Sequence, residues 1–557
     1  MRWTLLIVSL LAACTDKDDD TDTTAADDTS VTDVTDTADT ADTADTADTD
    51  TGVDETTDTV PDWDPRFDAL ADALEIDRLA GDAPGLAAAV FEGDALVFSA
   101  GFGERHPTDG GAVADTTLFR IGSITKMMTA AGLLQQVEAG RAALSDSLTT
   151  AVPGLDFALS PGVADDVMLS HLLTHQGGLY DYVAVDWGSE DELLEDVLTG
   201  EIAAGLPFIA PPGVMWNYSN PNYSYAGLAL ELADGRYYRE ALDADLFTPL
   251  GMDRTYFLGE EVLADGDYAS GATVDWNTGV GSVVAEPDSY DNAWGRPAGF
   301  AWSSVLDLTA FAQFLLYGDD AVLADDLRES MSAPQVDQGI GTETWYGYGL
   351  QVQQGFYFGD DWYDLTMISH GGAIPGFSAD LYYLPELEVG IAALANTDGA
   401  YLNQSLGELL RLVELPEPGT PPDWTIDPER HGDFVGHYLE PWNIGDFDVL
   451  LTESGDLNLS CPTLDDISYP YDVALQPYTP DNFVATFDGQ GVLLTFIRDD
   501  AGEVAYARTR YFVGALDDSG GPVGPPSLTV DTQRLQAGIQ AASTADHRAA
   551  LLLKPLD

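Results

Sequence analysis

The sequence predicts an α/β domain followed by a smaller domain built from β-strands. Residues 85–103 have the patterns of two strands joined by a turn near Glu92. Residues 389–397 form a buried strand pattern, which is followed by a helical pattern over 401–413. A long region with helical patterns lies between these early and late strands. This order favours a sheet packed against helices.

A proline-rich segment separates the two expected domains. Leu415–Trp424 contains four prolines in ten residues, which marks an interruption of regular structure. The residues after it show strand patterns, with hairpins expected about Ser454-Gly455 and about 500–502. We therefore expect the larger domain over 63–415, a linker over 416–425 and a small antiparallel β domain or barrel over 426–557.

The first residues have the features of an export signal. Arg2 precedes an apolar or small run from Trp3 to Ala13, which is too short to span a bilayer. The junction after this run, at Cys14, resembles the bacterial lipoprotein signal, in which the cysteine becomes the lipidated first residue. An ordinary signal peptide that contains Cys14 by chance is the alternative. With Cys14 lipidated, Cys461 has no intramolecular partner, and Thr15 favours sorting to an outer membrane.

Residues 14–62 are predicted to form an extended acidic tether. Residues 15–64 hold 19 of the 96 acidic residues and one basic residue, and they include an Asp-Thr-Ala repeat. Such a segment has too little apolar surface to offset the entropy of ordering. Residues 65–557 carry 77 acidic against 19 basic residues. This excess argues against nucleic acid as a partner and against adhesion to anionic lipid through basic residues.

One lysine stands out in the segment IGSITKMMTA. Lys126 is one of three lysines in the chain, and the other two, Lys17 and Lys554, lie close to its ends. The helix expected over Ser123–Gly140 places Ser123 and Lys126 on one face. A serine hydroxyl needs a base to become a nucleophile, and a lysine amine serves when its pKa is lowered, whereas arginine does not deprotonate. A chance Ser-x-x-Lys is the alternative.

A second motif, Tyr218-Ser219-Asn220, is expected in a turn that leads into a helix. A phenol held near a lysine ammonium is stabilised as a phenolate and relays a proton, which would be the role of Tyr218. Asn220 would orient Lys126 and donate to a substrate carbonyl. Taken alone, the same three residues indicate no more than a turn.

A third motif, His370-Gly371-Gly372, is expected on an edge strand beside the site. Its glycines allow the backbone to approach a ligand closely. The N–H of Ala373, together with that of Ser123, would form an oxyanion hole. We therefore assign His370, Gly372 and Ala373 to substrate binding, as we do Asn220. The alternative is a plain bulge in which His370 is a partly buried strand residue.

Six motifs in this order resemble the serine β-lactamase-related family, which includes class C β-lactamases, D-alanyl-D-alanine carboxypeptidases and esterases. They are FRIGSITK, LLTHQGGL, YSN, LFTPLGMDRT, PAGFAWSSVLDLTAFAQFLL and HGG. The resemblance implies a sandwich in which helices flank an antiparallel sheet, with an all-helical subdomain and the site between them. It also implies that Ser123 is acylated, that Lys126 and Tyr218 share the proton transfers, and that water releases the acyl group. The C-terminal strands resemble the lipocalin-like domain that often follows such a unit.

One departure from the family bears on the substrate. The family's third motif is often Lys-Thr-Gly, and here His370 replaces the fixed positive charge with a titratable one. We therefore expect a small-molecule or peptide substrate, either a D-amino-acid peptide or a small ester. A β-lactamase proper is an alternative, and a slow or inactive lipoprotein that binds penicillin or a polymer is another.

A zinc hydrolase is a further alternative, using His171 and His175 in HLLTH. Their spacing suits two ligands on one helix face, but Leu172 stands where the glutamate after the first histidine is required. We therefore expect neither a metal nor a cofactor. We expect an exported protein that a lipid on Cys14 anchors in the bacterial envelope, and the oligomeric state is left open.

Overall fold

The computed structural model describes most of the chain after the expected tether. The described residues are 63–517 apart from 182–189, 275–280, 285–286, 288, 290 and 342, and 530–532, 534–536, 538–540 and 543. They belong to one compact unit. The expected signal, the lipid site at Cys14, Thr15 and the tether lie outside them. None of the helices in the described part has the length and apolar character of a membrane span.

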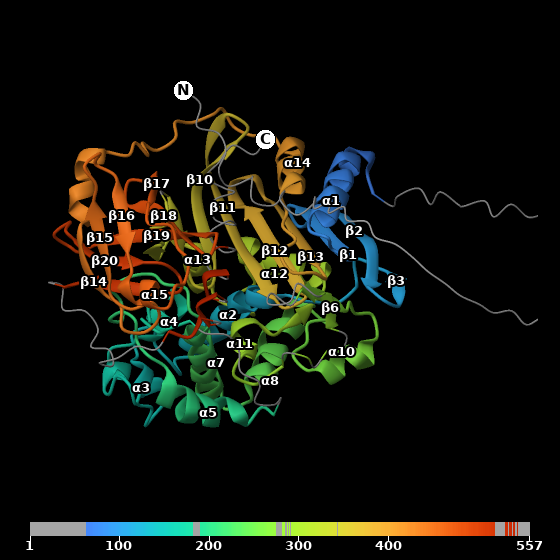
Figure 1. The fold of residues 1–557 in the computed structure, drawn as a ribbon. Coiled ribbons are helices and arrows are strands. Elements are labelled where there is room, and N and C mark those ends of the chain that lie inside the picture. Colours follow the sequence, from blue (N-terminus) through green and yellow to red (C-terminus); the bar gives the residue numbers. More distant parts are fainter. Residues whose placement is uncertain are drawn as a thin grey trace, which may run out of the picture. The chain divides into compact units, whose positions relative to one another are not determined.

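The larger domain is built on a nine-stranded antiparallel sheet in the order β3-β2-β1-β13-β12-β11-β10-β9-β8 (Figure 1). Its strands are β1 (Gly85–Glu92), β2 (Ala95–His106), β3 (Gly110–Ala112), β8 (Val336–Asp337), β9 (Thr344–Tyr346), β10 (Gln351–Phe358), β11 (Asp361–Ile374), β12 (Phe377–Leu384) and β13 (Val389–Ala395). The first and last of the predicted strands are neighbours, because β1 pairs with β13 from Leu86↔Ala395 to Glu92↔Val389. The sheet therefore joins the first and the last strand segments of the larger domain.

Helices cover both faces of this sheet, as the α/β prediction requires. Along β1, Ala87 and Phe91 enter one core, whereas Leu86 and Val90 enter the other. The second core is closed by α1 and α14, and the first by α2 and α12 (Figure 1). The main helices are α1 (Asp68–Ala80), α2 (Thr125–Glu138), α7 (Asn220–Asp234), α10 (Gly259–Asp265), α12 (Val305–Tyr317), α13 (Asp325–Ser332) and α14 (Gln404–Leu412).

A helical region lies beside α2, and α2 is the element that joins it to the sheet. Every residue of α2 from Thr125 to Leu134 is buried, because the helix packs against α7 and α11 as well as against the first core. A helix that is apolar all round is expected in such a position. The short helices around it are α3 (Leu148–Ala151), α4 (Leu169–Leu173), α5 (Leu193–Val197), α6 (Ala203–Gly205), α8 (Tyr238–Leu242), α9 (Thr248–Leu250) and α11 (Arg296–Gly299).

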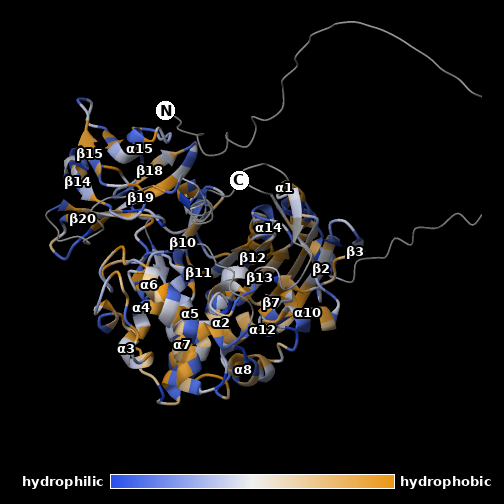
Figure 2. Ribbon diagram, turned by 60° about the horizontal axis from the view of Figure 1, so that its bottom comes forward, coloured by the Kyte–Doolittle hydropathy of each residue, from blue (hydrophilic) through white to orange (hydrophobic). Residues whose placement is uncertain are grey.

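The C-terminal domain is an eight-stranded antiparallel sheet in the order β16-β15-β14-β21-β20-β19-β18-β17. It is nearly a closed barrel, since the N–H of Leu459 donates to Val473 at 2.7 Å and that of Leu475 to Leu457 at 3.0 Å. Both predicted hairpins are present, and Figure 2 shows hydrophobic strands with hydrophilic loop tips. The elements are β14 (Gly436–Leu439), β15 (Phe447–Leu451), β16 (Leu457–Ser460), α15 (Pro462–Asp466), β17 (Gln476–Thr479), β18 (Asn482–Phe487), β19 (Gln490–Arg498), β20 (Val504–Arg508) and β21 (Val513–Leu516).

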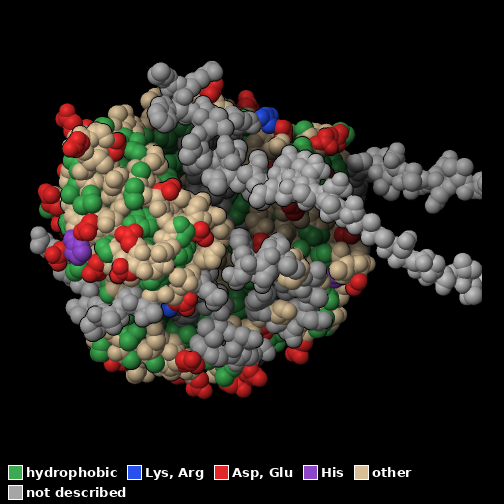
Figure 3. All heavy atoms as spheres, viewed as in Figure 1, with side chains coloured by type: hydrophobic (Ala, Val, Ile, Leu, Met, Phe, Trp, Pro, Cys, Tyr) green, Lys and Arg blue, Asp and Glu red, His purple; other side chains and the backbone are tan. Residues whose placement is uncertain are grey.

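The surface carries the acidic excess of the composition. Figure 3 shows Asp and Glu side chains spread over the face in view, with few basic ones among them. The buried Arg296 is paired with carboxylates, since its Nε lies 2.9 Å from Asp291 and its Nη1 contacts Asp191, whereas the buried Arg120 donates to backbone carbonyls. Much of the interior positive charge is therefore neutralised locally.

Candidate active site

Ser123 lies in a tight turn immediately before α2. β4 (Phe119–Arg120) leads into the 3₁₀ turn η2 (Gly122–Ile124), and α2 begins at Thr125, two residues later than the expected helix start. Gly122 has φ +52°, and a Cβ there would lie 2.6 Å from the amide nitrogen of Ala373. Glycine is thus required at 122 both by the backbone angle and by the close approach of β11.

Lys126 is completely buried beneath Ser123. Its Nζ lies 3.0 Å from Ser123 Oγ, 2.7 Å from Asn220 Oδ1 and 2.5 Å from the carbonyl oxygen of Ala298. Burial lowers the pKa of the Lys126 ammonium well below its ordinary value of 10.5. A neutral amine has two N–H groups and one lone pair. When Asn220 and Ala298 accept the two N–H groups, the lone pair faces Ser123 Oγ, which is the geometry of a general base.

The orientation of Asn220 is fixed from its other side by Asp181. Asp181 Oδ1 accepts from Asn220 Nδ2 at 3.0 Å and from the Asn220 backbone N–H at 2.9 Å. The amide oxygen of Asn220 is thereby turned toward Lys126. The structure thus brings Asn220 to Lys126, while one hydrogen of its Nδ2 is engaged by a carboxylate rather than directed to a substrate carbonyl.

Tyr218 is buried above the lysine, with its ring centroid 4.9 Å from Lys126 Nζ. The ring of His175 lies 4.2 Å from that of Tyr218, and His175 Nδ1 accepts from the Ser219 N–H at 3.1 Å. Burial lowers the pKa of His175 well below its usual range, which keeps the imidazole neutral and able to accept. His175 therefore supports the Tyr218 turn.

The other histidine of the HLLTH segment has a local contact. His171 Nδ1 accepts from the Met168 N–H at 3.2 Å, at the start of α4. Within the described ranges, no group of three or more His, Cys, Asp and Glu is arranged to hold a metal.

His370 lies on β11, which is an inner strand and not the edge strand that the sequence suggested. β11 pairs with both β10 and β12, but its ladder with β10 stops at Ser369. From His370 onward β12 is the strand that pairs with β11, and the other side of β11 contacts η2. A Cβ on Gly372 would lie 2.0 Å from the Ile121 carbonyl oxygen, and Ala373 is exposed. These two residues therefore border the Ser123 turn.

The hydrogen bonds of His370 suit a neutral imidazole. Its Nδ1 lies 2.7 Å from the carbonyl oxygen of Gly371, which accepts only, so Nδ1 carries the hydrogen. Its Nε2 lies 3.0 Å from the hydroxyl of Tyr346. Burial raises the pKa of Tyr346 well above its ordinary value, and its hydroxyl can donate to Nε2 of the neutral ring or accept from the charged ring.

Four residues near the site were missed by sequence reasoning: Asp181, His175 in its role beside Tyr218, Tyr346 and Arg510. Asp181 lies two residues after the end of the LLTHQGGL motif, which is the only sequence signal for it. Arg510 comes from the C-terminal domain, and its Cζ lies 4.4 Å from the Tyr218 ring centroid. No local pattern connects such distant positions.

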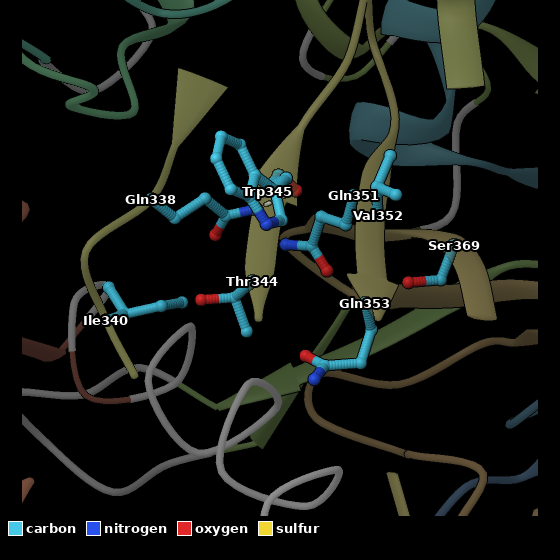
Figure 4. Close-up of a pocket in the computed structure, with 8 residues that line it drawn as sticks. All are labelled: Gln338, Ile340, Thr344, Trp345, Gln351, Val352, Gln353 and Ser369. Atoms are coloured by element: carbon cyan, nitrogen blue, oxygen red, sulfur yellow. Dashed lines mark hydrogen bonds between the residues drawn. The ribbon is translucent and has the colours of Figure 1, made fainter. Parts of the chain in front are cut away.

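A small pocket lies next to the strand that carries His370 (Figure 4). The amide side chains of Gln338 and Gln351 point toward each other there, and that of Gln353 points away from them. The full lining is Gln338, Ile340, Thr344, Trp345, Gln351, Val352, Gln353 and Ser369. Ser369, the residue before His370, is the part of this lining that β11 contributes.

Comparison with known proteins gives consistent matches. The family model described as Beta-lactamase matches residues 68–413. Penicillin-binding protein 4 of Amycolatopsis lactamdurans is 29% identical over 384 residues, which are 65% of this chain and 92% of that protein. The octameric penicillin-binding protein homologue from Pyrococcus abyssi has a TM-score of 0.53 and 25% identity, covering 77% of this chain and 96% of its own. A crystal structure of SurE has a TM-score of 0.59 at 23% identity, covering 81% and 99%, which shows a shared fold.

Proposed function

This chain belongs to the Beta-lactamase family, and we propose that it is a serine hydrolase that forms an acyl-enzyme on Ser123. The observation that supports this most directly is the buried Lys126, whose Nζ lies 3.0 Å from Ser123 Oγ. A lysine in that place has a lowered pKa and a lone pair directed at the hydroxyl. These are the two properties that a general base for serine requires.

In the proposed reaction, Ser123 Oγ attacks the carbonyl carbon of an amide or ester, and its proton passes to the pair of Lys126 and Tyr218. The N–H groups of Ser123 and Ala373 stabilise the oxygen that becomes negative. The same pair returns the proton to the leaving amine or alcohol as the carbon–heteroatom bond breaks. A water molecule then attacks the ester of Ser123 and regenerates the hydroxyl.

We propose D-amino-acid peptides or small esters as the substrates. His370 supports this, because a titratable histidine does not offer the fixed positive charge with which a lysine would attract the carboxylate of a β-lactam. A slow penicillin-binding function is the second candidate, favoured by the name of the Amycolatopsis lactamdurans relative.

The test is covalent labelling with a neutral fluorophosphonate and with a fluorescent penicillin. We expect the fluorophosphonate to add to Ser123 of the wild type and not to a Ser123→Ala variant, as measured by intact mass. Turnover of D-Ala-D-Ala peptides, nitrocefin and p-nitrophenyl esters then ranks the substrates. Absence of labelling by both reagents, with the protein folded, would exclude the proposed mechanism.

We also propose that a lipid on Cys14 anchors the domain in the cell envelope. The apolar run that ends at Cys14 and the acidic segment after it support this. Expression in a bacterium with labelled palmitate should give a labelled protein in the membrane fraction. A Cys14→Ser variant should carry no label and should leave that fraction.

A further inference from the structure

A loop of the C-terminal domain reaches the catalytic residues. The loop follows Arg508, the last residue of β20. Arg508 Nη2 donates to the carbonyl of Gln338 at 2.8 Å, and its Nη1 donates to that of Trp216. Two residues later, Arg510 Nε and Nη2 lie 3.1 and 2.9 Å from Asp181 Oδ2. The Arg510 guanidinium also lies over the Tyr218 ring. One domain thus places an arginine against the active-site turn of the other.

Arg510 is the outer end of a continuous series of hydrogen bonds that leads to the nucleophile. Asp181 binds Arg510 through Oδ2 and Asn220 through Oδ1, and Asn220 in turn accepts from Lys126. The two ends of the Asn220 amide are chemically different. With its NH₂ held by a carboxylate, only its oxygen can face Lys126. If the carboxylate swung away, the amide could turn its NH₂ toward the amine, and Lys126 would lose an acceptor.

The charge of Asp181 creates a problem that Arg510 solves. Asp181 is needed to orient Asn220, but its negative charge raises the pKa of Lys126 and so favours the inactive ammonium. Arg510 lowers the same pKa. In the ion pair, Asp181 still orients Asn220, while Arg510 offsets the effect of the Asp181 charge on the pKa of Lys126. The titratable groups around Lys126 are Asp181, Arg510, His175, Tyr218 and Tyr223.

We propose that Arg510 is a positioning residue for the reaction at Ser123, and that the C-terminal domain therefore completes the active site. Arg510 acts by holding Asp181, which fixes Asn220 and Lys126, and not by binding substrate. This inference rests on the proposed serine hydrolase function.

The experiment measures the second-order rate of Ser123 labelling against pH, with a neutral fluorophosphonate and with a penicillin, which carries a carboxylate. Arg510→Ala should slow both reagents by about ten- to hundredfold, since small displacements of a base have effects of this size. It should also move the acidic limb of the pH profile to higher pH, because Asp181 then raises the pKa of Lys126 without the opposing charge of Arg510. Asp181→Ala should slow labelling as well but move that limb downward.

Two further variants give the inference its sharpest test. At a pH above the acidic limb of both profiles, the double variant Arg510→Ala/Asp181→Ala should label no more slowly than Asp181→Ala alone, because the arginine positions the lysine only through the aspartate. Arg510→Lys should restore part of the rate. The inference would be overturned by additive losses in the double variant or by an unchanged rate in Arg510→Ala. It would also be overturned by a loss seen only with the penicillin, because that result would show direct contact of Arg510 with a substrate carboxylate.

Arg498→Ala is the matched control. Arg498 in β19 also lies 2.9 Å from an aspartate, Asp481, and 5.4 Å from an aromatic ring, that of Phe434. We expect this variant to lower the melting temperature of the C-terminal domain and to leave labelling unchanged. Near-UV circular dichroism of each variant shows whether it has folded. If wild type does not label at all, the proposed function fails; if wild type labels and Arg510→Ala labels equally fast, only the role of Arg510 fails.

Discussion

Replacing Lys126 tests the chemistry most directly, because a lysine that serves only as a cation and a lysine that serves as a neutral base lead to opposite predictions. If the residue served only as a cation, Lys126→Arg would be the mild change and Lys126→Met the severe one. If it serves as a neutral amine, arginine is unsuitable, since its guanidinium keeps its proton. We therefore expect both variants to lose Ser123 labelling, and arginine to be the more damaging to stability.

The magnitudes follow from the contacts of Nζ. A general base contributes about 10²–10⁴ in rate, which corresponds to about 3–5 kcal/mol of activation free energy. Lys126→Met leaves the buried carbonyl of Ala298 without a donor, which costs about 1–3 kcal/mol. Lys126→Arg places a permanent charge where the wild-type side chain is 0% exposed, at a cost on the order of 3–5 kcal/mol.

The assays are fluorophosphonate labelling followed by intact mass, and urea unfolding at several pH values. The folded-state pKa of Lys126 lies below the ordinary 10.5, so the unfolded chain binds a proton that the folded site does not. Wild type should therefore gain stability relative to Lys126→Met as the pH rises toward 10.5. The reasoning is refuted if Lys126→Arg labels at a rate near that of wild type, or is the more stable of the two variants.

Three other predictions concern the framework around the site. Asp77→Ala should lower the free energy of unfolding by about 3 kcal/mol in urea titrations, because Asp77 accepts from three backbone N–H groups and a hydroxyl at the start of α14. Replacement of the exposed Asp72 by alanine is the control, and neither variant should change the labelling of Ser123. The buried Cys461 thiol, whose pKa burial raises, should react with Ellman's reagent only after unfolding, and rapid reaction of the native protein would contradict this. Burial raises the pKa of Glu440 to about 7, so wild type should lose up to about 3 kcal/mol of stability as the pH rises from 4.5 to above 7, and Glu440→Gln should show no such slope.

The proximity of Ser123 and Lys126 could be predicted from the sequence because it is local. Ser123 and Lys126 are three residues apart, and any helical turn at that point brings them together. The structure replaces the first turn by a 3₁₀ segment, since Gly122 must pass beneath β11, but Nζ still reaches Oγ. Strand alternation and the proline-rich boundary allowed the two-domain fold to be predicted for the same reason, as each is visible within a short window.

The supporting residues could not be predicted, because they depend on pairings between distant segments. Arg510 and Asp181 are 329 positions apart, and no periodicity in the sequence joins them. The place of β11 was predicted incorrectly because the motif shows that open backbone is needed but not which neighbour ends early. Only the register shows that the β10 ladder stops at Ser369, so that β12 is the strand with which His370 pairs.

The charges of the site also depend on partners that the sequence does not reveal. His370 stands where related proteins often carry lysine, and its contacts with Tyr346 and the carbonyl of Gly371 are compatible with a neutral imidazole. Arg510 is held by the carboxylate of Asp181. The positive groups beside Ser123 are thus each neutralised or able to lose their proton, and a carboxylate on the substrate has little to attract it. Because the surrounding surface is strongly acidic, it would repel anionic substrates further. Uncharged esters and amides are therefore the substrates to which this arrangement presents the smallest electrostatic barrier.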